Sequence, residues 1–296
     1  MLPFWHDKFV VPVIHEDLVY RGTSRGDMWA EGALLSKDGL FVFPVVGGVP
    51  IFVEIALEVF SRVFLALREG RGIDRELSYV KYNWEHIQEK LKTAPSSPWV
   101  RYAKMISRED GLIVDIATGL GGGFVPAVLS FDPEAKIMIS DVDPLVIASW
   151  KRFLDGKYPN VSYACFDATR MPLRSESVDV VVSSGGFGNI PYQYAAFSEA
   201  YRILRRGGKL YIADGMIYRE DLEKLPKELY MAIKTSFPLN DTGYADFLEK
   251  LGFRILNNEY YGEEVLDPQE GLVPRIAYEH GVRLRYTGVY IVAQKA

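Results

Sequence analysis

The chain of 296 residues has 48% hydrophobic and 25% charged residues, the balance of a folded globular protein, and a net charge of −5 at neutral pH. The acidic balance disfavours a broad phosphate-binding surface, and therefore a nucleic-acid partner. Its single cysteine, Cys165, excludes an internal disulfide and a cysteine-built zinc site, and the four histidines are scattered, so no metal site is predicted. No apolar run is long enough to span a membrane and no leader pattern opens the chain, so we expect no membrane partner and a cytoplasmic location. The sequence indicates no oligomeric state.

Residues 1–54 predict a small β-module without metal ligands. The run GLFVFPVVGGVPIFVE indicates two short strands around Gly47 and Gly48, with Pro44 and Pro50 limiting each strand to an edge or an end. So few apolar residues cannot bury enough surface to fold alone. We therefore expect the module to dock on the rest of the chain.

Residues 55–109 change to a helical period and predict a segment of helices. The first helix ends at Gly70, and the second runs through RELSYVKYNWEHIQEKLK. Ser97 and Pro98 suit the cap and the first turn of a third helix.

From residue 110 onward, strands and helices alternate at the spacing of βαβ units, which predicts a parallel sheet. The stretch LIVDIATGLGGGF at 112–124 indicates a strand, a tight glycine loop and a helix start. Glycines permit positive φ and let a ligand lie on the backbone, and a helix N-terminus offers unpaired N–H groups. This loop predicts a nucleotide site. A dinucleotide fingerprint would need glycine where Phe124 stands, and it would give no reason for Asp115.

Two further acids follow predicted strands. Asp141 ends the strand KIMIS, twenty residues past Gly121, and a carboxylate there accepts two hydrogen bonds from a ribose diol. Asp143 with Pro144 instead predicts the cap of the next helix. Asp167 ends the strand VSYACF.

The pattern D-x-x-x-G-x-G at positions 115–121 resembles motif I of the class I S-adenosylmethionine (SAM) methyltransferases. Ala117 and Thr118 replace the commoner Gly-Cys, which resembles the quinone-biosynthesis branch, known as methyltransferase domain 11. The runs MPLRSESVDVVVSS and AFSEAYRILRRGGKLYIAD are similar to the links around the family's fourth and fifth strands, with Gly207 and Gly208 expected to stop a helix. The last turns of this predicted helix contain three basic residues that are expected to face solvent, Arg202, Arg205 and Arg206.

The resemblance implies a Rossmann-like α/β core over residues 110–296, with a seven-stranded, mainly parallel sheet and an antiparallel last strand. It also implies SAM as cofactor and S-adenosylhomocysteine as product. In the family, the acid and glycines of the first loop hold the methionine, the next acid the ribose, and the third strand end the adenine. The residues expected at the cofactor are Asp115, Ala117, Gly119, Gly121, Asp141, Val142, Asp167, Ala168 and Ser184.

In many members a helix rich in Tyr and Trp folds over SAM, and Tyr79, Tyr82 and Trp84 occupy the corresponding region. Residues 55–109 are therefore expected to form a lid. The run NIPY at 189–192 is similar to the N-P-P-Y run of amino-group methyltransferases, but Ser183 and Ser184 stand where that run should begin.

Methyl transfer from SAM is a direct displacement, so orientation matters most and few catalytic side chains are expected. A base is required only when the acceptor must lose a proton. Tyr82, His86, Tyr192 and Tyr244 are the candidates. The sequence predicts methylation of a small molecule of the apolar or aromatic type. The alternatives are an rRNA or tRNA methyltransferase and a non-catalytic SAM-binding protein, while a nicotinamide oxidoreductase is disfavoured by the glycine spacing.

Overall fold

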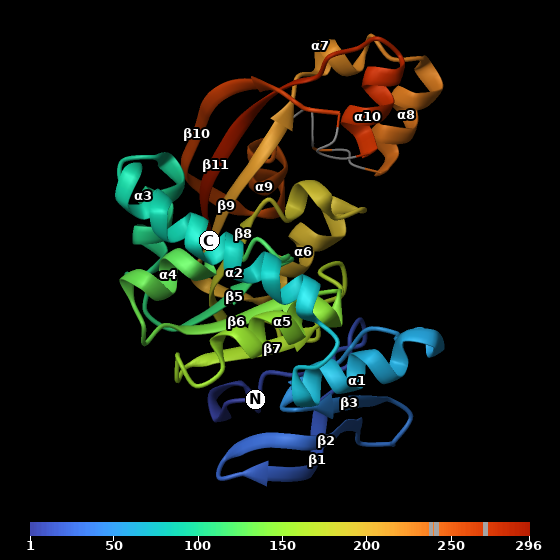
Figure 1. The fold of residues 1–296 in the computed structure, drawn as a ribbon, viewed down its shortest axis with the longest axis vertical. Helices are drawn as coiled ribbons and strands as arrows, with labels where there is room; N and C mark the ends of the chain where they lie inside the picture. Colours follow the sequence, from blue (N-terminus) through green and yellow to red (C-terminus); the bar gives the residue numbers. More distant parts are fainter. Residues whose placement is uncertain (237–238, 240–242, 269–271) are drawn as a thin grey trace.

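The computed structural model describes residues 1–236, 239, 243–268 and 272–296, and it contains two sheets (Figure 1). The larger has seven strands in the order β10-β11-β9-β8-β5-β6-β7, and the smaller has four in the order β1-β2-β3-β4. The strands are β1 (Leu18–Arg25), β2 (Met28–Ser36), β3 (Val42–Val46), β4 (Val49–Pro50), β5 (Leu112–Asp115), β6 (Lys136–Asp141), β7 (Val161–Cys165), β8 (Val178–Ser184), β9 (Leu204–Ile217), β10 (Phe253–Val265) and β11 (Arg285–Lys295). The α-helices are α1 (Phe60–Glu69), α2 (Asp74–Thr93), α3 (Pro98–Ile106), α4 (Val125–Phe131), α5 (Pro144–Leu154), α6 (Gln193–Ile203), α7 (Arg219–Leu222), α8 (Lys227–Ser236), α9 (Ala245–Leu251) and α10 (Leu272–Glu279). Short 3-10 helices span Pro3–Trp5, Leu57–Val59 and Phe187–Asn189.

The larger sheet confirms the predicted fold class. Strands β5 to β9 pair in parallel, and β11 lies antiparallel between β9 and β10. The parallel strands β6 and β8 flank β5 on opposite sides, so the chain order reverses at β5. The carboxyl ends of the strands there form a crevice in which ligands bind in open α/β sheets.

Alternating strand residues feed two hydrophobic cores, one on each face of the sheet. Ile113 and Val180 belong to the core that contains residues of α1 to α5, whereas Val114 and Val181 belong to the core that contains residues of α6 and α9. Both faces are covered, which explains why these strands are continuously apolar.

The N-terminal module contains the predicted β3–β4 hairpin, in which Val46 pairs with Val49 around the two glycines. It also contains the longer hairpin of β1 and β2, which the sequence analysis missed. Most of β1 is exposed, so its residues lack the apolar alternation that marks a half-buried strand.

The module covers an open edge of the large sheet. Ile51 forms a parallel bridge with Cys165 of β7, and the Phe52 amide donates to the Cys165 carbonyl at 2.8 Å. Trp5 and Trp29, both buried, belong to the same core as α6 and α9. Residues before 54 thus share their core with the rest of the chain.

The predicted helix caps are present. The Ser97 hydroxyl accepts from the Val100 amide at 3.4 Å, and the Asp143 carboxylate accepts from the Leu145 amide at 2.8 Å. Gly70 ends α1 in the left-handed conformation, with φ of 65°.

The glycine pair at 207 and 208 was wrongly predicted to stop a helix. Helix α6 ends at Ile203, and both glycines lie inside β9 beside a shift in its register with β8. The strand begins early because Leu204 already pairs with Val178.

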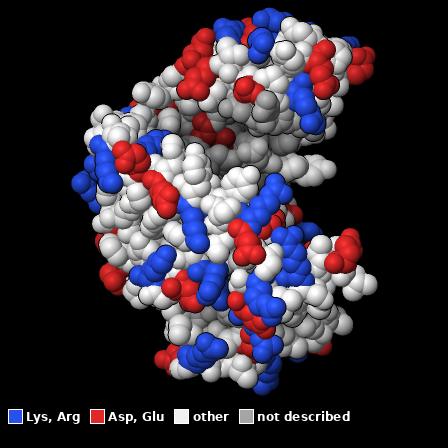
Figure 2. Space-filling view, in the orientation of Figure 1, with Lys and Arg blue, Asp and Glu red and all other residues white. Residues whose placement is uncertain are grey.

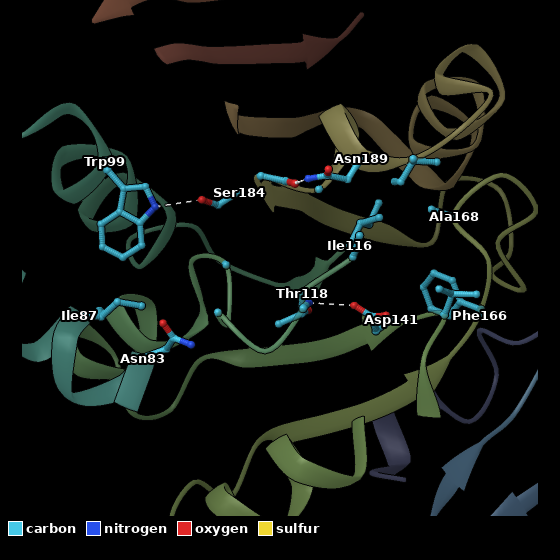
Figure 3. Close-up of a pocket in the computed structure, with 18 of the residues that line it drawn as sticks. Asn83, Ile87, Trp99, Ile116, Thr118, Asp141, Phe166, Ala168, Ser184 and Asn189 are labelled. Carbon is cyan, nitrogen blue, oxygen red and sulfur yellow. Dashed lines mark hydrogen bonds between the residues drawn. The ribbon is translucent and has the colours of Figure 1, made fainter. Parts of the chain in front are cut away.

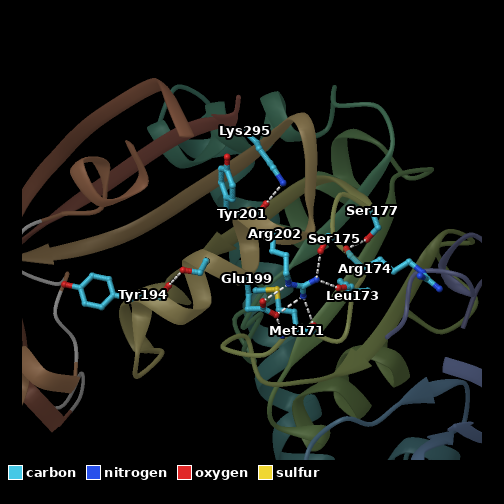
Figure 4. Close-up of polar contacts among 11 residues, drawn as sticks. Met171, Leu173, Arg174, Ser175, Ser177, Tyr194, Glu199, Tyr201, Arg202 and Lys295 are labelled. Atoms are coloured by element: carbon cyan, nitrogen blue, oxygen red, sulfur yellow. Dashed lines mark hydrogen bonds and ion pairs between the residues drawn. The ribbon is translucent and has the colours of Figure 1, made fainter. Parts of the chain in front are cut away.

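The solvent-facing interpretation of Arg202 was also wrong (Figure 4). Its guanidinium donates to both carboxylate oxygens of Glu199 at 2.7 and 2.8 Å, and to the carbonyls of Leu173 and Met171 at 2.6 and 2.9 Å. Only 16% of the Arg202 side chain is exposed. It ties α6 to the segment that leads into β8, while Arg205 of β9 pairs with Asp179.

Helices α7, α8 and α10 form a lobe beyond the ends of β9 to β11, at the top of Figure 1. A separate apolar cluster that includes Leu222 and Leu284 holds it together. Asp221, almost fully buried, accepts hydrogen bonds from Lys224 at 2.6 Å and from the Arg285 side chain at 2.8 Å. The predicted end of the connecting segment, near position 241, lies outside the described residues.

Candidate active site

The glycine loop after β5 is shaped for close approach by a ligand. Ala117 and Gly119 have φ of 52° and 59°, and the Gly119 amide donates to the Asp141 carboxylate at 2.8 Å. A Cβ added to Gly121 would meet no protein atom within 4 Å. The backbone at Gly121 therefore faces open space.

Asp115 lies beneath this loop. It is fully buried, and one carboxylate oxygen accepts from the Thr118 hydroxyl at 2.5 Å. The other has no hydrogen-bond partner among the described residues, and a Cβ on Gly123 would come within 2.8 Å of it. Burial raises the pKa of Asp115 to about 8, although the hydrogen bond from Thr118 acts to lower it. Asp115 thus orders the loop from below, and its contact with a methionine amino group stays a prediction.

A cavity of about 730 Å³ opens above the loop, at the carboxyl ends of the central strands (Figure 3). Its volume is in the range of cofactor pockets, roughly 300–1,000 Å³. Every predicted cofactor residue except Asp115 lines it: Ala117, Gly119, Gly121, Asp141, Val142, Asp167, Ala168 and Ser184.

Asp141 is held in place by backbone donors. One oxygen accepts from the Gly119 amide and the other from the Asp143 amide at 2.9 Å. Burial raises its pKa, although these hydrogen bonds oppose the change. Each oxygen keeps acceptor capacity for a hydroxyl in the cavity.

An apolar wall follows Asp141. Val142 is 59% exposed and lines the cavity together with Phe166 and Ala168. Asp167 stands beside them, and one of its oxygens accepts from the Thr169 amide and hydroxyl, both at 2.8 Å. A flat ring can pack on this wall with its polar edge near Asp167.

Helices α2 and α3 close the cavity with residues that the sequence analysis did not assign to it. Asn83, Ile87 and Lys90 of α2 line it, and the Asn83 amide contacts the Leu120 carbonyl at 3.4 Å. Trp99 of α3 donates from its indole N–H to the Ser184 hydroxyl at 3.1 Å. Residues 83, 87 and 90 are spaced so that they lie on one face of a helix, and this spacing was the one feature of the sequence that could have predicted them together at the cavity.

The catalytic candidates lie in different surroundings. His86 lines the cavity, whereas Tyr82 stacks on His86 with 6.3 Å between ring centroids and is 66% exposed. Tyr192 is 71% exposed and does not line the cavity, although Pro191 does. Tyr244 is buried. Their catalytic roles stay predictions.

The aromatic residues expected in the lid, Tyr79, Tyr82 and Trp84, do not line the cavity, although other residues of α2 do. Tyr79 is half exposed, and Trp84 packs against Phe153, with ring centroids 5.3 Å apart.

A second cavity of about 420 Å³ adjoins the first. Lys90, Trp99, Ser184 and Gly185 line both. The rest of its wall comes from β9, β10 and β11 and includes Asp214, Glu264, Tyr261, Tyr286 and Tyr290. A donor and an acceptor molecule could therefore meet at the shared wall.

Over the described ranges, no group of His, Cys, Asp and Glu residues is arranged to hold a metal ion. None of the helices described there is both long enough and apolar enough to cross a membrane.

The strand order, the antiparallel last strand and a cavity above the first glycine loop together define the class I SAM methyltransferase architecture. Residues 114–212 match the family model of a methyltransferase domain. The predicted resemblance to the quinone-biosynthesis branch is confirmed by the relatives. A demethylmenaquinone methyltransferase of Chlorobaculum parvum is 31% identical over 135 residues, which cover 42% of this chain and 54% of the relative.

The ubiquinone/menaquinone biosynthesis C-methyltransferase UbiE of Pseudomonas putida is 26% identical over 143 residues, covering 47% of this chain and 55% of the relative. The chain thus spans about half the length of the curated relatives it matches. Among solved structures, a protein of Bacillus halodurans assigned to the methyltransferases superposes with a TM-score of 0.51 at 20% identity. The match covers 68% of this chain and 99% of that protein, and it supports the fold alone.

Proposed function

We propose that this protein transfers a methyl group from SAM to a small aromatic acceptor and releases S-adenosylhomocysteine. The observation that carries the proposal is the pair of adjoining cavities. One lies on the glycine loop at the reversal point of the sheet, and the other has an aromatic wall; Lys90, Trp99, Ser184 and Gly185 line both.

The residues present fit SAM. The open backbone at Gly121 leaves room for a ligand against the loop, and the fixed carboxylate of Asp141 suits a ribose diol. Val142 and Phe166 would flank the adenine, with Asp167 at its amino edge. SAM, when bound, supplies a methyl group that is already activated for displacement.

The chain's own contribution would then be orientation and exclusion of water. Fixing donor and acceptor in line contributes roughly 7–11 kcal/mol in favourable cases. Helix α2 and Trp99 would cover the reacting groups, and the hydrogen bond from Trp99 to Ser184 fixes the shared wall.

A small acceptor is favoured over RNA by the wall and by the surface. Tyr261, Tyr286 and Tyr290 give the second cavity an aromatic character, and the relatives named above are quinone-biosynthesis enzymes. On the face of the molecule drawn in Figure 2, Lys and Arg are mixed with Asp and Glu and form no continuous basic tract. RNA recognition depends on such a tract for phosphate contacts.

The test is incubation of the protein with methyl-labelled SAM and a cell extract, followed by separate counting of the organic-soluble, RNA and protein fractions. We expect label in the organic-soluble fraction. The Gly121→Leu variant is the matched control: its side chain should project into the first cavity without a backbone clash, and should abolish labelling in a folded protein. Label that is recovered in RNA and lost on ribonuclease treatment would overturn the small-molecule proposal.

A further inference from the structure

Asp214 of β9 is a carboxylate that none of the roles assigned above explains. It lines the second cavity, one residue beyond Ala213, which pairs with Ser184 of the shared wall. Its two oxygens accept from the Gly188 amide at 2.6 Å and the Gly215 amide at 2.9 Å. No Lys or Arg forms an ion pair with it in the part of the chain that is described. A carboxylate withdrawn from water without a cation is costly, and such groups cluster at functional sites.

The surroundings of Asp214 shift the pKa of its carboxyl group toward the range that suits proton transfer. Burial raises its pKa to about 6, although the amides of Gly215 and Gly188 oppose the change. Behind it lies the hydroxyl of Tyr244, which is buried and close to Asp214, and which also opposes the rise in the pKa of that carboxyl. A carboxylate with a pKa near the working pH is an efficient general base.

The second cavity, which Asp214 lines, suits a flat acceptor. Trp99 and three tyrosines contribute to its wall, and Lys90 lies over the Trp99 ring at 4.7 Å from its centroid. The four earlier candidates, Tyr82, His86, Tyr192 and Tyr244, do not line this cavity. Asp214 is therefore better placed than the earlier candidates to meet an acceptor.

We propose that Asp214 is the general base that removes the hydroxyl proton of a phenol or hydroquinone bound in the second cavity. The inference rests on the proposed function and names the group that activates the acceptor. The O–H bond breaks, and its proton goes to a carboxylate oxygen of Asp214. The electron pair left on the acceptor, on oxygen or by conjugation on a ring carbon, forms the new bond to the methyl carbon. The carbon–sulfur bond breaks with its pair on sulfur, and transfer to carbon ends with loss of the ring proton.

The test compares two acceptors that differ in their need for a base. The first, 1,4-dihydroxynaphthalene kept reduced under argon, is neutral at pH 7. The second, 2-hydroxy-1,4-naphthoquinone, is already ionised there. Asp214→Asn should lower kcat/KM for the first by about 10²- to 10⁴-fold, the usual contribution of a general base. With 2-hydroxy-1,4-naphthoquinone, the variant should be as fast as the wild type or faster, because the negative charge of Asp214 no longer repels the anionic acceptor.

The pH profile gives a second readout. In the wild type, kcat/KM for 1,4-dihydroxynaphthalene should rise with pH through about 6, since only the ionised Asp214 accepts a proton. Asp214→Asn should remove this limb. The other titratable or charged groups around Asp214 are Tyr244, which lies beside it, and five that line the same cavity: Lys90, Glu264, Tyr261, Tyr286 and Tyr290. Glu259→Gln is the matched control, because Glu259 lies on β10, pairs with Arg101 and lines neither cavity.

A binding measurement separates this role from a structural one. Calorimetry should give the same S-adenosylhomocysteine affinity, within about twofold, for the wild type and Asp214→Asn. The anion of 2-hydroxy-1,4-naphthoquinone should bind the variant more tightly at pH 8. Equal losses with both acceptors, or an unchanged pH limb, would overturn the role of Asp214 and leave the proposed function standing. A wild type that methylates neither acceptor would refute the aromatic acceptor, and the inference with it.

Discussion

Replacing Asp141 tests the cofactor site most directly. In the proposed complex its carboxylate accepts two hydrogen bonds from the ribose, and a hydrogen bond to a charged group contributes roughly 1.5–3 kcal/mol. Loss of both therefore predicts a cost of at least about 3 kcal/mol. We expect Asp141→Ala to weaken S-adenosylhomocysteine binding by about 100-fold or more, measured by calorimetry.

Asp141 also accepts from the Gly119 amide, so part of the loss could come from a disordered loop. A 2′-deoxy analogue of S-adenosylhomocysteine separates the two effects. If the carboxylate binds the ribose, Asp141→Ala should cost clearly less with the analogue than with the natural ligand. Asp143→Ala is the control, since that carboxylate caps α5 at Leu145 and its loss should cost about 1 kcal/mol of stability without changing affinity. Equal losses with both ligands, or an affinity within twofold of the wild type, would refute the assignment.

Three further predictions concern stability. Arg202→Ala leaves Glu199 without its cation at a site where both side chains are mostly buried. It should cost about 3 kcal/mol in the free energy of unfolding, measured in urea, and Arg202→Lys should recover part of this loss. Burial raises the pKa of Asp221, but hydrogen bonds from Arg285 and Lys224 outweigh this and hold it well below its ordinary value. The contribution of the Asp221 carboxylate to the free energy of unfolding is therefore fully present above about pH 4 and is lost as pH falls through the lowered pKa of the folded state. Asp221→Asn should make stability depend less on pH in the acid range. An unchanged acid dependence would count against a stabilising role of these hydrogen bonds. A chain of residues 110–296 alone should aggregate, because Ile51 and its neighbours no longer cover β7; a soluble fragment with native affinity for S-adenosylhomocysteine would contradict this.

The sequence by itself determined the central sheet and the first cavity's floor. Asp115, the glycines after it and Asp141 stand at fixed short distances along strand–loop–helix units, and parallel strands bring their carboxyl ends to one edge whatever the rest of the chain does. The caps at Ser97 and Asp143 were equally predictable, because a cap involves only the next few residues.

Only the tertiary structure decided the rest. Strand β1 is mostly exposed and therefore lacks a periodic apolar pattern. Strand β9 starts before its glycine pair because Val178 of β8 pairs with Leu204. Lys90, Trp99 and Asp214 lie on α2, α3 and β9, far apart in the sequence, and they meet at one cavity because those elements pack together around the end of β8. Contacts of this kind depend on how separate elements pack, and no local spacing in the sequence encodes them.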